Sequence, residues 1–334
     1  MTSDFMRQEM AVAAANIASE CLAVEPDEEV LVLADARTVG VADAVATAAS
    51  AVGADVVTQV MPLLDSHGNE PLPTVEEAMV VADVAFTCTT HAITHTNARL
   101  RAAEAGTRVG VLRGVTEEMM VDGAMTVDFP ALRRRTEAVR DVLDAGRSVR
   151  VTAANGTDVS FSIDGCQAFS LDGYFHEEYG FATLPPGESP THPKEGTANG
   201  TIVVDVSMDG IGRLDDPITL EVVDGFVEEV TGGEEAAQLR EIFADADENA
   251  RNLAEFAVGT NPAAKLIGNL AEDKKLAGTV HFAVGDNESL GGSTASSIHL
   301  DGVVRSPTVE VDGERLVEAG SLPSEKALGS DRSL

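Results

Sequence analysis

Two histidines and an aspartate near the end of the chain have the types and spacing of a metal site. His281 and His299 each lie in a short apolar run typical of a β-strand, and a Gly-rich loop separates the two runs. His299 and Asp301 are two residues apart, so their side chains point to the same face of a strand. Neutral imidazoles with a carboxylate suit Zn, Fe, Co or Ni. The alternative is a pair of ordinary hydrogen-bonded strand histidines, and the pattern alone leaves both open.

Two glutamates are further candidate ligands. Glu188 lies in a proline-rich segment, residues 184–193, where the prolines fix the backbone and hold a side chain in place. Glu255 lies between Ala254 and Phe256 in an otherwise apolar run. Buried carboxylates are rare unless they are paired or bound to a metal. In a chain with 56 acidic residues, the alternative for either glutamate is a solvated surface position.

His91 and His95 run from the end of a predicted strand into a predicted helix. In open α/β sheets the ligand crevice lies at the carboxyl ends of the strands. Both histidines are therefore candidates for substrate binding, and the alternative is a capping contact at the helix start.

The elements around these residues predict two domains. Residues 29–34, 55–61, 84–90 and 107–112 are apolar strands that alternate with helices, which predicts a parallel sheet with helices on both faces. Hairpin turns at Asn155-Gly156 and Asp224-Gly225 indicate an α+β domain rich in antiparallel strands, which carries the metal site. We predict an α/β domain at 1–147, a metal-binding catalytic domain at 148–320 and a flexible tail at 321–334.

Composition excludes several classes of function. The net charge is -33, from 56 acidic and 23 basic residues spread along the chain, so nucleic acid and anionic membranes are excluded as partners. Such a surface, with only five lysines and no tryptophan, suggests a halophilic protein in a salt-rich cytoplasm. Three scattered cysteines form no disulfide framework. Without a signal-like start or a long apolar run, we expect a cytoplasmic protein.

Six segments, in order along nearly the whole chain, resemble the M29 metallo-aminopeptidases of the aminopeptidase T group. They are Thr94–Arg99, Leu184–Glu188, Pro193–Gly200, Leu253–Phe256, His281–Gly285 and Ile298–Asp301. The resemblance implies that Glu188, Glu255, His281, His299 and Asp301 hold two divalent metals, Zn, Co or Mn, and that the protein is a homodimer. Asp286, Asn287 and Glu288 stand where that family has a catalytic tyrosine, and Asn287 is a candidate for substrate binding.

Under this resemblance we expect an aminopeptidase that removes N-terminal residues from small peptides. Three carboxylates, two neutral imidazoles and two divalent ions leave a formal charge of plus one, which a bridging hydroxide neutralises. That hydroxide is the nucleophile of a two-metal hydrolase. Glu255 or Glu188 is the expected catalytic carboxylate that shuttles its proton.

Two alternatives remain open. The chain is similar in length to the 2,5-dihydroxypyridine dioxygenases of the same superfamily, which use one non-haem iron. Two histidines and one carboxylate form the facial triad of such enzymes, and His281, His299 and Asp301 supply it. In that case His95 is the candidate base beside the ring. The other alternative is a catalytically inactive homologue that keeps the fold.

Overall fold

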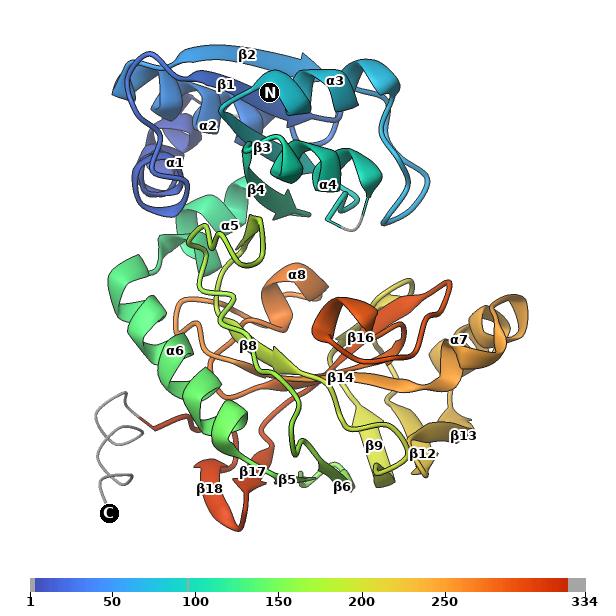
Figure 1. The fold of residues 1–334 in the computed structure, drawn as a ribbon. Helices are drawn as coiled ribbons and strands as arrows, with labels where there is room; N and C mark the ends of the chain where they lie inside the picture. The colour runs from blue at the N-terminus through green and yellow to red at the C-terminus, as the bar shows by residue number, and fades with distance from the viewer. Residues whose placement is uncertain (1–3, 95, 324–334) are drawn as a thin grey trace. The chain divides into compact units, whose positions relative to one another are not determined.

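The computed structural model describes residues 4–94 and 96–323, which fall into two compact units (Figure 1). The first unit comprises residues 1–129 and 171–186, and the second comprises residues 130–170 and 187–334. The first contains a parallel sheet and the second contains antiparallel sheets, so the predicted fold class is confirmed. Among the described helices, none is both long and apolar enough to span a bilayer.

The first unit is built on a five-stranded parallel sheet in the order β2-β1-β3-β4-β7. Its strands are β1 (Glu29–Ala34), β2 (Asp55–Val60), β3 (Val84–Thr89), β4 (Arg108–Arg113) and β7 (Phe181–Leu184). Its helices are α1 (Asp4–Asn16), α2 (Val39–Val52), α3 (Pro73–Val81), α4 (Asn97–Glu104) and α5 (Glu117–Asp122), with a π-helical turn at Ile17–Cys21 and a 3-10 turn at Ala124–Thr126. Every residue of β3 is buried, which explains its continuous apolar run.

The second unit contains a six-stranded sheet in the order β11-β10-β16-β15-β14-β8 and a seven-stranded sheet in the order β13-β12-β9-β6-β5-β17-β18. The strands of the six-stranded sheet are β8 (Glu188–Thr191), β10 (Ser207–Met208), β11 (Gly212–Arg213), β14 (Leu253–Gly259), β15 (Val280–Gly285) and β16 (His299–Val304). The others are β5 (Ser148–Thr152), β6 (Asp158–Ser162), β9 (Asn199–Val204), β12 (Ile218–Val223), β13 (Phe226–Gly232), β17 (Thr308–Val311) and β18 (Glu314–Val317). The helices are α6 (Phe129–Ala145), α7 (Glu234–Asp245) and α8 (Leu270–Asp273), with 3-10 turns at Glu248–Arg251 and Glu288–Leu290.

An aromatic cluster joins the two antiparallel sheets. Phe161 comes from the seven-stranded sheet, and Phe256 and Phe282 come from the six-stranded sheet. The Phe161 ring centroid lies 5.2 Å from that of Phe256 and 6.2 Å from that of Phe282, within the range of favourable ring pairs. One face of the six-stranded sheet is therefore buried in the core, and its other face is available for polar side chains.

The units divide at residues 129/130, whereas the sequence analysis placed the boundary at 147/148. The shift follows from packing, because Val139 and Leu143 of α6 are buried in the hydrophobic core of the second unit. Residues 171–186 return to the first unit, where β7 pairs in parallel with β4. Most of the predicted tail, from residue 324 onward, lies outside the described residues.

Candidate metal centre

Three neighbouring antiparallel strands carry four of the five predicted ligands. Glu255 lies on β14, His281 on β15, and His299 and Asp301 on β16. Strand β15 lies between the other two, and both Glu255 and Asp301 are paired with its Ala283. Paired residues on adjacent strands project from the same face of a sheet. The ligands therefore share one face, around the small side chain of Ala283.

A β-bulge in β14 gives Glu255 its direction. Leu253 pairs with Val284 and Glu255 pairs with Ala283, so β14 advances two residues while β15 advances one. Such a bulge changes the face to which the following side chains point. Leu253 consequently packs in the hydrophobic core, whereas Glu255 contacts His281 on the opposite face.

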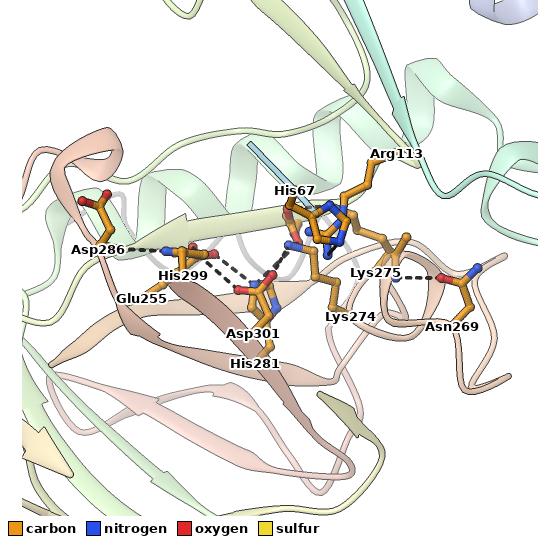
Figure 2. A network of polar contacts seen from close by, with 12 residues as sticks. His67, Arg113, Glu255, Asn269, Lys274, Lys275, His281, Asp286, His299 and Asp301 are labelled. Atoms are coloured by element: carbon orange, nitrogen blue, oxygen red, sulfur yellow. Dashed lines mark hydrogen bonds and ion pairs between the residues drawn. The ribbon is translucent and has the colours of Figure 1, made fainter. Parts of the chain in front are cut away.

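The side chains of this cluster lie within contact distance of one another (Figure 2). Glu255 contacts two imidazoles, since its Oε1 is 3.0 Å from His281 Nε2 and its Oε2 is 3.1 Å from His299 Nε2. Asp301 Oδ1 lies 3.4 Å from His299 Nε2. Glu188, at the start of edge strand β8, reaches the same place, with its Oε2 3.7 Å from His281 Nε2. The structure thus brings all five predicted ligands together.

Burial and neighbouring charges oppose each other in this cluster. Burial favours a higher pKa for Glu255, but hydrogen bonds from His281 and His299 outweigh it and hold that pKa well below its usual range. Burial also favours a higher pKa for Asp301, but Lys274 and His299 hold it well below the usual value. Burial favours a lower pKa for His299, yet its bonds to Asp301 and Glu255 raise it well above the usual value. The carboxylates are therefore ionised at neutral pH, as metal ligands must be.

The donor set fits a divalent transition metal. One ligand atom from each of Glu255, His281 and Asp301 lies within 4.8 Å of the others. Within the described part of the chain, buried Asp301 Oδ1 accepts no hydrogen bond of normal geometry, although His299 Nε2 lies 3.4 Å away at ion-pair distance. A buried carboxylate oxygen normally has a donor or a cation. His299 Nδ1 lies 2.7 Å from the carbonyl oxygen of Asp286, and we assign it as the donor, which leaves Nε2 to bind a metal.

Two lysines that the sequence analysis missed complete the cluster. Lys274 Nζ lies 2.9 Å from Asp301 Oδ2 and 3.4 Å from Glu188 Oε2, and Lys275 forms an ion pair with Glu188 Oε1. Burial lowers the pKa of Lys275 to about 8, although the Glu188 charge opposes this shift. Burial works to raise the pKa of Glu188, but the two ammonium groups lower it below its usual value. The signal in the sequence was their rarity, because only five lysines occur in the chain.

The sequence analysis also predicted three substrate-binding residues, His91, His95 and Asn287. His91 belongs to the first unit, where its ring packs edge-on against His67 at 4.8 Å. His95 lies outside the described residues. Asn287 is in the second unit and is fully buried. Its Nδ2 donates to Glu195 Oε1 at 3.1 Å and its Oδ1 accepts from Thr294 N at 2.8 Å, so its amide holds a loop. Substrate binding by His91, His95 and Asn287 stays a prediction.

Comparison with known proteins places this site in a family. The model of the NicX family, described as 2,5-dihydroxypyridine 5,6-dioxygenase, matches residues 12–324. The chain belongs to this family. It is 27% identical over 203 residues to a 2,5-dihydroxypyridine 5,6-dioxygenase of Pseudomonas putida KT2440, a match that spans 57% of this chain and 58% of that protein. The match thus covers less than two thirds of the relative's length.

Two solved structures share the fold. The 2,5-dihydroxypyridine dioxygenase of Pseudomonas putida KT2440 has a TM-score of 0.81 at 22% identity, over 96% of this chain and 99% of that chain. AmpT from Thermus thermophilus has a TM-score of 0.67 at 18% identity, over 94% and 99%. The family model confirms the dioxygenase-like branch of the predicted resemblance, and the likeness to AmpT is one of fold. The named relative and the family model favour the dioxygenase alternative over the aminopeptidase that the motifs placed first.

Proposed function

We propose that this protein is a mononuclear non-haem iron(II) dioxygenase that opens a hydroxylated pyridine ring, with 2,5-dihydroxypyridine as the first compound to test. The observation that carries the proposal is the convergence of two imidazoles and a carboxylate, His281, His299 and Asp301, in a member of a dioxygenase family. This is the ligand set of the facial triad in non-haem iron oxygenases. Ferrous iron, when bound, supplies the redox chemistry through which dioxygen reacts with an electron-rich ring.

The residues of the chain have separate tasks in this proposal. The Asp286 carbonyl accepts from His299 Nδ1 and so keeps the Nε2 lone pair directed at the site. Asp301 offers Oδ1 to the metal while its Oδ2 is held by Lys274. Glu255, whose pKa is depressed, remains an ionised carboxylate, which accepts a hydrogen bond from a substrate hydroxyl and so orients the ring. Glu255, His281 and Asp301 are buried from bulk water, whereas the His299 side chain is 32% exposed.

The aminopeptidase remains a second candidate because Glu188 and Glu255 lie beside the triad. The resemblance to the aminopeptidase T group implies that both are metal ligands, and His281 Nε2 lies within 3.7 Å of both carboxylates. A two-metal hydrolase needs such extra carboxylates to bind its second ion.

One experiment separates the two candidates. Protein purified without oxygen is analysed for metal, then supplied with 2,5-dihydroxypyridine in an oxygen electrode, and separately with peptides that have free amino termini. We expect about one iron per chain and about one dioxygen consumed per ring lost. About two zinc, cobalt or manganese ions per chain, with release of amino acids and no oxygen uptake, would overturn the proposal in favour of the hydrolase.

A further inference from the structure

Lys274 and Lys275 place two positive charges against the carboxylates that a second metal would need. Both oxygens of Glu188 face an ammonium group, Oε1 that of Lys275 and Oε2 that of Lys274. Lys274 also reaches Asp301 Oδ2 at 2.9 Å, so one ammonium bridges two carboxylates. A cation between two carboxylates is what a metal ion would provide, but here that cation is an ammonium group of the protein.

The lysines are fixed in this position by buried contacts of their own segment. Asp273, the last residue of α8, is fully buried. Its Oδ2 accepts from Ser207 Oγ at 2.7 Å, and its Oδ1 accepts from Ile267 N at 2.6 Å. The backbone of Lys275 is held by Asn261, whose N donates to the Lys275 carbonyl at 2.8 Å. The ammonium groups are thus preorganised, and Lys275 itself is only 1% exposed.

Charge decides how many metals this arrangement accepts. Three carboxylates and two ammonium groups, counted with both imidazoles neutral as they must be to bind a metal, give the cluster a formal charge of minus one. One divalent ion brings it to plus one, and a second would bring it to plus three inside a buried site. Uncompensated buried charge is strongly unfavourable. Without the lysines, two divalent ions would leave plus one, so the lysines are what makes the second ion unfavourable.

We propose that Lys274 and Lys275 act as a built-in second cation, which restricts this centre to one metal and makes the pair the determinant of metal stoichiometry. The inference rests on the proposed function in that a one-metal centre is its starting point. It assigns the lysines a role in setting the number of bound metal ions rather than in the reaction. It predicts that the site binds a second ion when the lysines are replaced by uncharged residues.

The test replaces both lysines by methionine, an unbranched side chain of similar length that carries no charge. Wild type and Lys274→Met/Lys275→Met protein are stripped with chelator, reloaded with Co²⁺ and analysed for cobalt after gel filtration. We expect the content to rise from about one to about two ions per chain. Melting curves measured with and without Co²⁺ check folding, since an ion that binds only the folded state raises the melting temperature. If the double variant does not fold, Lys274→Met alone tests the bridge, with the same expected gain.

Two controls sharpen the result. Lys265→Met removes an exposed lysine that precedes α8 and should leave the content at about one ion. Glu188→Gln added to the double variant removes a carboxylate of the new site and should return it to about one ion. A folded double variant that still binds about one ion overturns the inference and leaves the proposed function standing. A wild type that binds about two ions overturns the proposed function and the inference with it.

Discussion

The two units bury acidic side chains against different kinds of partner. In the first unit Asp35 directly follows β1 and is 1% exposed, and its carboxylate accepts from Arg37 N at 2.9 Å and from Thr90 N at 2.7 Å. The Thr90 hydroxyl adds a third donor at 3.1 Å. All three donors are uncharged, and together they hold two loops at the carboxyl ends of neighbouring strands. This pattern is that of a carboxylate with a structural role.

In the second unit the partners of the buried acids are themselves ionisable. Glu255 lies between two imidazoles, and Glu188 and Asp301 share the ammonium of Lys274. Such a cluster is costly to bury, and removing one charge leaves the others without compensation. The comparison teaches that the partners of a buried acid indicate its role. Uncharged donors indicate a structural carboxylate, and clustered ionisable groups indicate a site for a cation.

The largest expected effect is that of Asp301→Asn. The substitution keeps the size of the side chain but removes the charge that both Lys274 and a metal use. We expect metal affinity to fall by more than about 100-fold, the upper end for changes that only touch a ligand's neighbours, and oxygen uptake with the ring substrate to fall with it. Metal content and dioxygen consumption measure the effect. Asp158→Asn, an exposed acid of the same unit paired with Arg150, is the matched control. Full metal content in Asp301→Asn would show that clustered ionisable partners do not mark this acid as part of a cation site.

The sequence located the ligands because most of them follow simple spacing. His299 and Asp301 are two residues apart on one strand and emerge on one face, as strand alternation predicts. Glu255 is different, since strict alternation would place Leu253 and Glu255 on the same face. The bulge between them separates the two faces, and its position depends on pairing with β15, which local sequence does not encode. Glu255 was identified by its apolar neighbours and by the family motif.

What the sequence did not show are long-range features. Lys274 and Lys275 follow a four-residue helix, and they reach Glu188 only because the chain folds back on β8. The strand β7 has four residues in a passage rich in loops, and it is defined by parallel pairing with β4, about 70 residues earlier. Likewise, the assignment of α6 to the second unit follows from the core against which it packs. The positions of the two lysines, the pairing of β7 and the unit to which α6 belongs all depend on contacts between segments that are distant in the sequence.

A second prediction concerns the structural acid of the first unit. Asp35→Asn retains one oxygen acceptor but loses the charge that strengthens bonds from Arg37 N and Thr90 N. We expect the free energy of unfolding to fall by about 1–3 kcal/mol, with metal content unchanged. Denaturant unfolding and elemental analysis measure the two quantities. Asp55→Asn, at an exposed position where β2 begins, should change neither. Loss of metal without loss of stability in Asp35→Asn would contradict the assigned role.

The smallest expected effect tests whether the partners of an acid matter more than the unit in which it lies. Glu195 belongs to the second unit, yet its Oε1 accepts from uncharged donors, Ser293 N at 2.8 Å and Asn287 Nδ2 at 3.1 Å. Burial favours a higher pKa, but these hydrogen bonds outweigh it and lower the pKa of Glu195 from 4.5 to about 2. By the comparison above, this acid is structural although it lies in the metal-bearing unit.

A depressed pKa in the folded state stabilises the protein above the unfolded value and loses that contribution as the pH falls through the folded value. Wild type should therefore be more stable than Glu195→Gln by about 1 kcal/mol at neutral pH, after allowance for solvent screening, and the difference should vanish between pH 4.5 and about 2. Denaturant unfolding across this pH range measures the difference, and metal content at neutral pH should not change. Glu288→Gln, an exposed acid of the loop that Glu195 contacts through Ser293, is the matched control. If the two variants show the same pH dependence, or if Glu195→Gln loses its metal, the hydrogen-bond partners of an acid, here the half-buried Glu195, do not indicate its role.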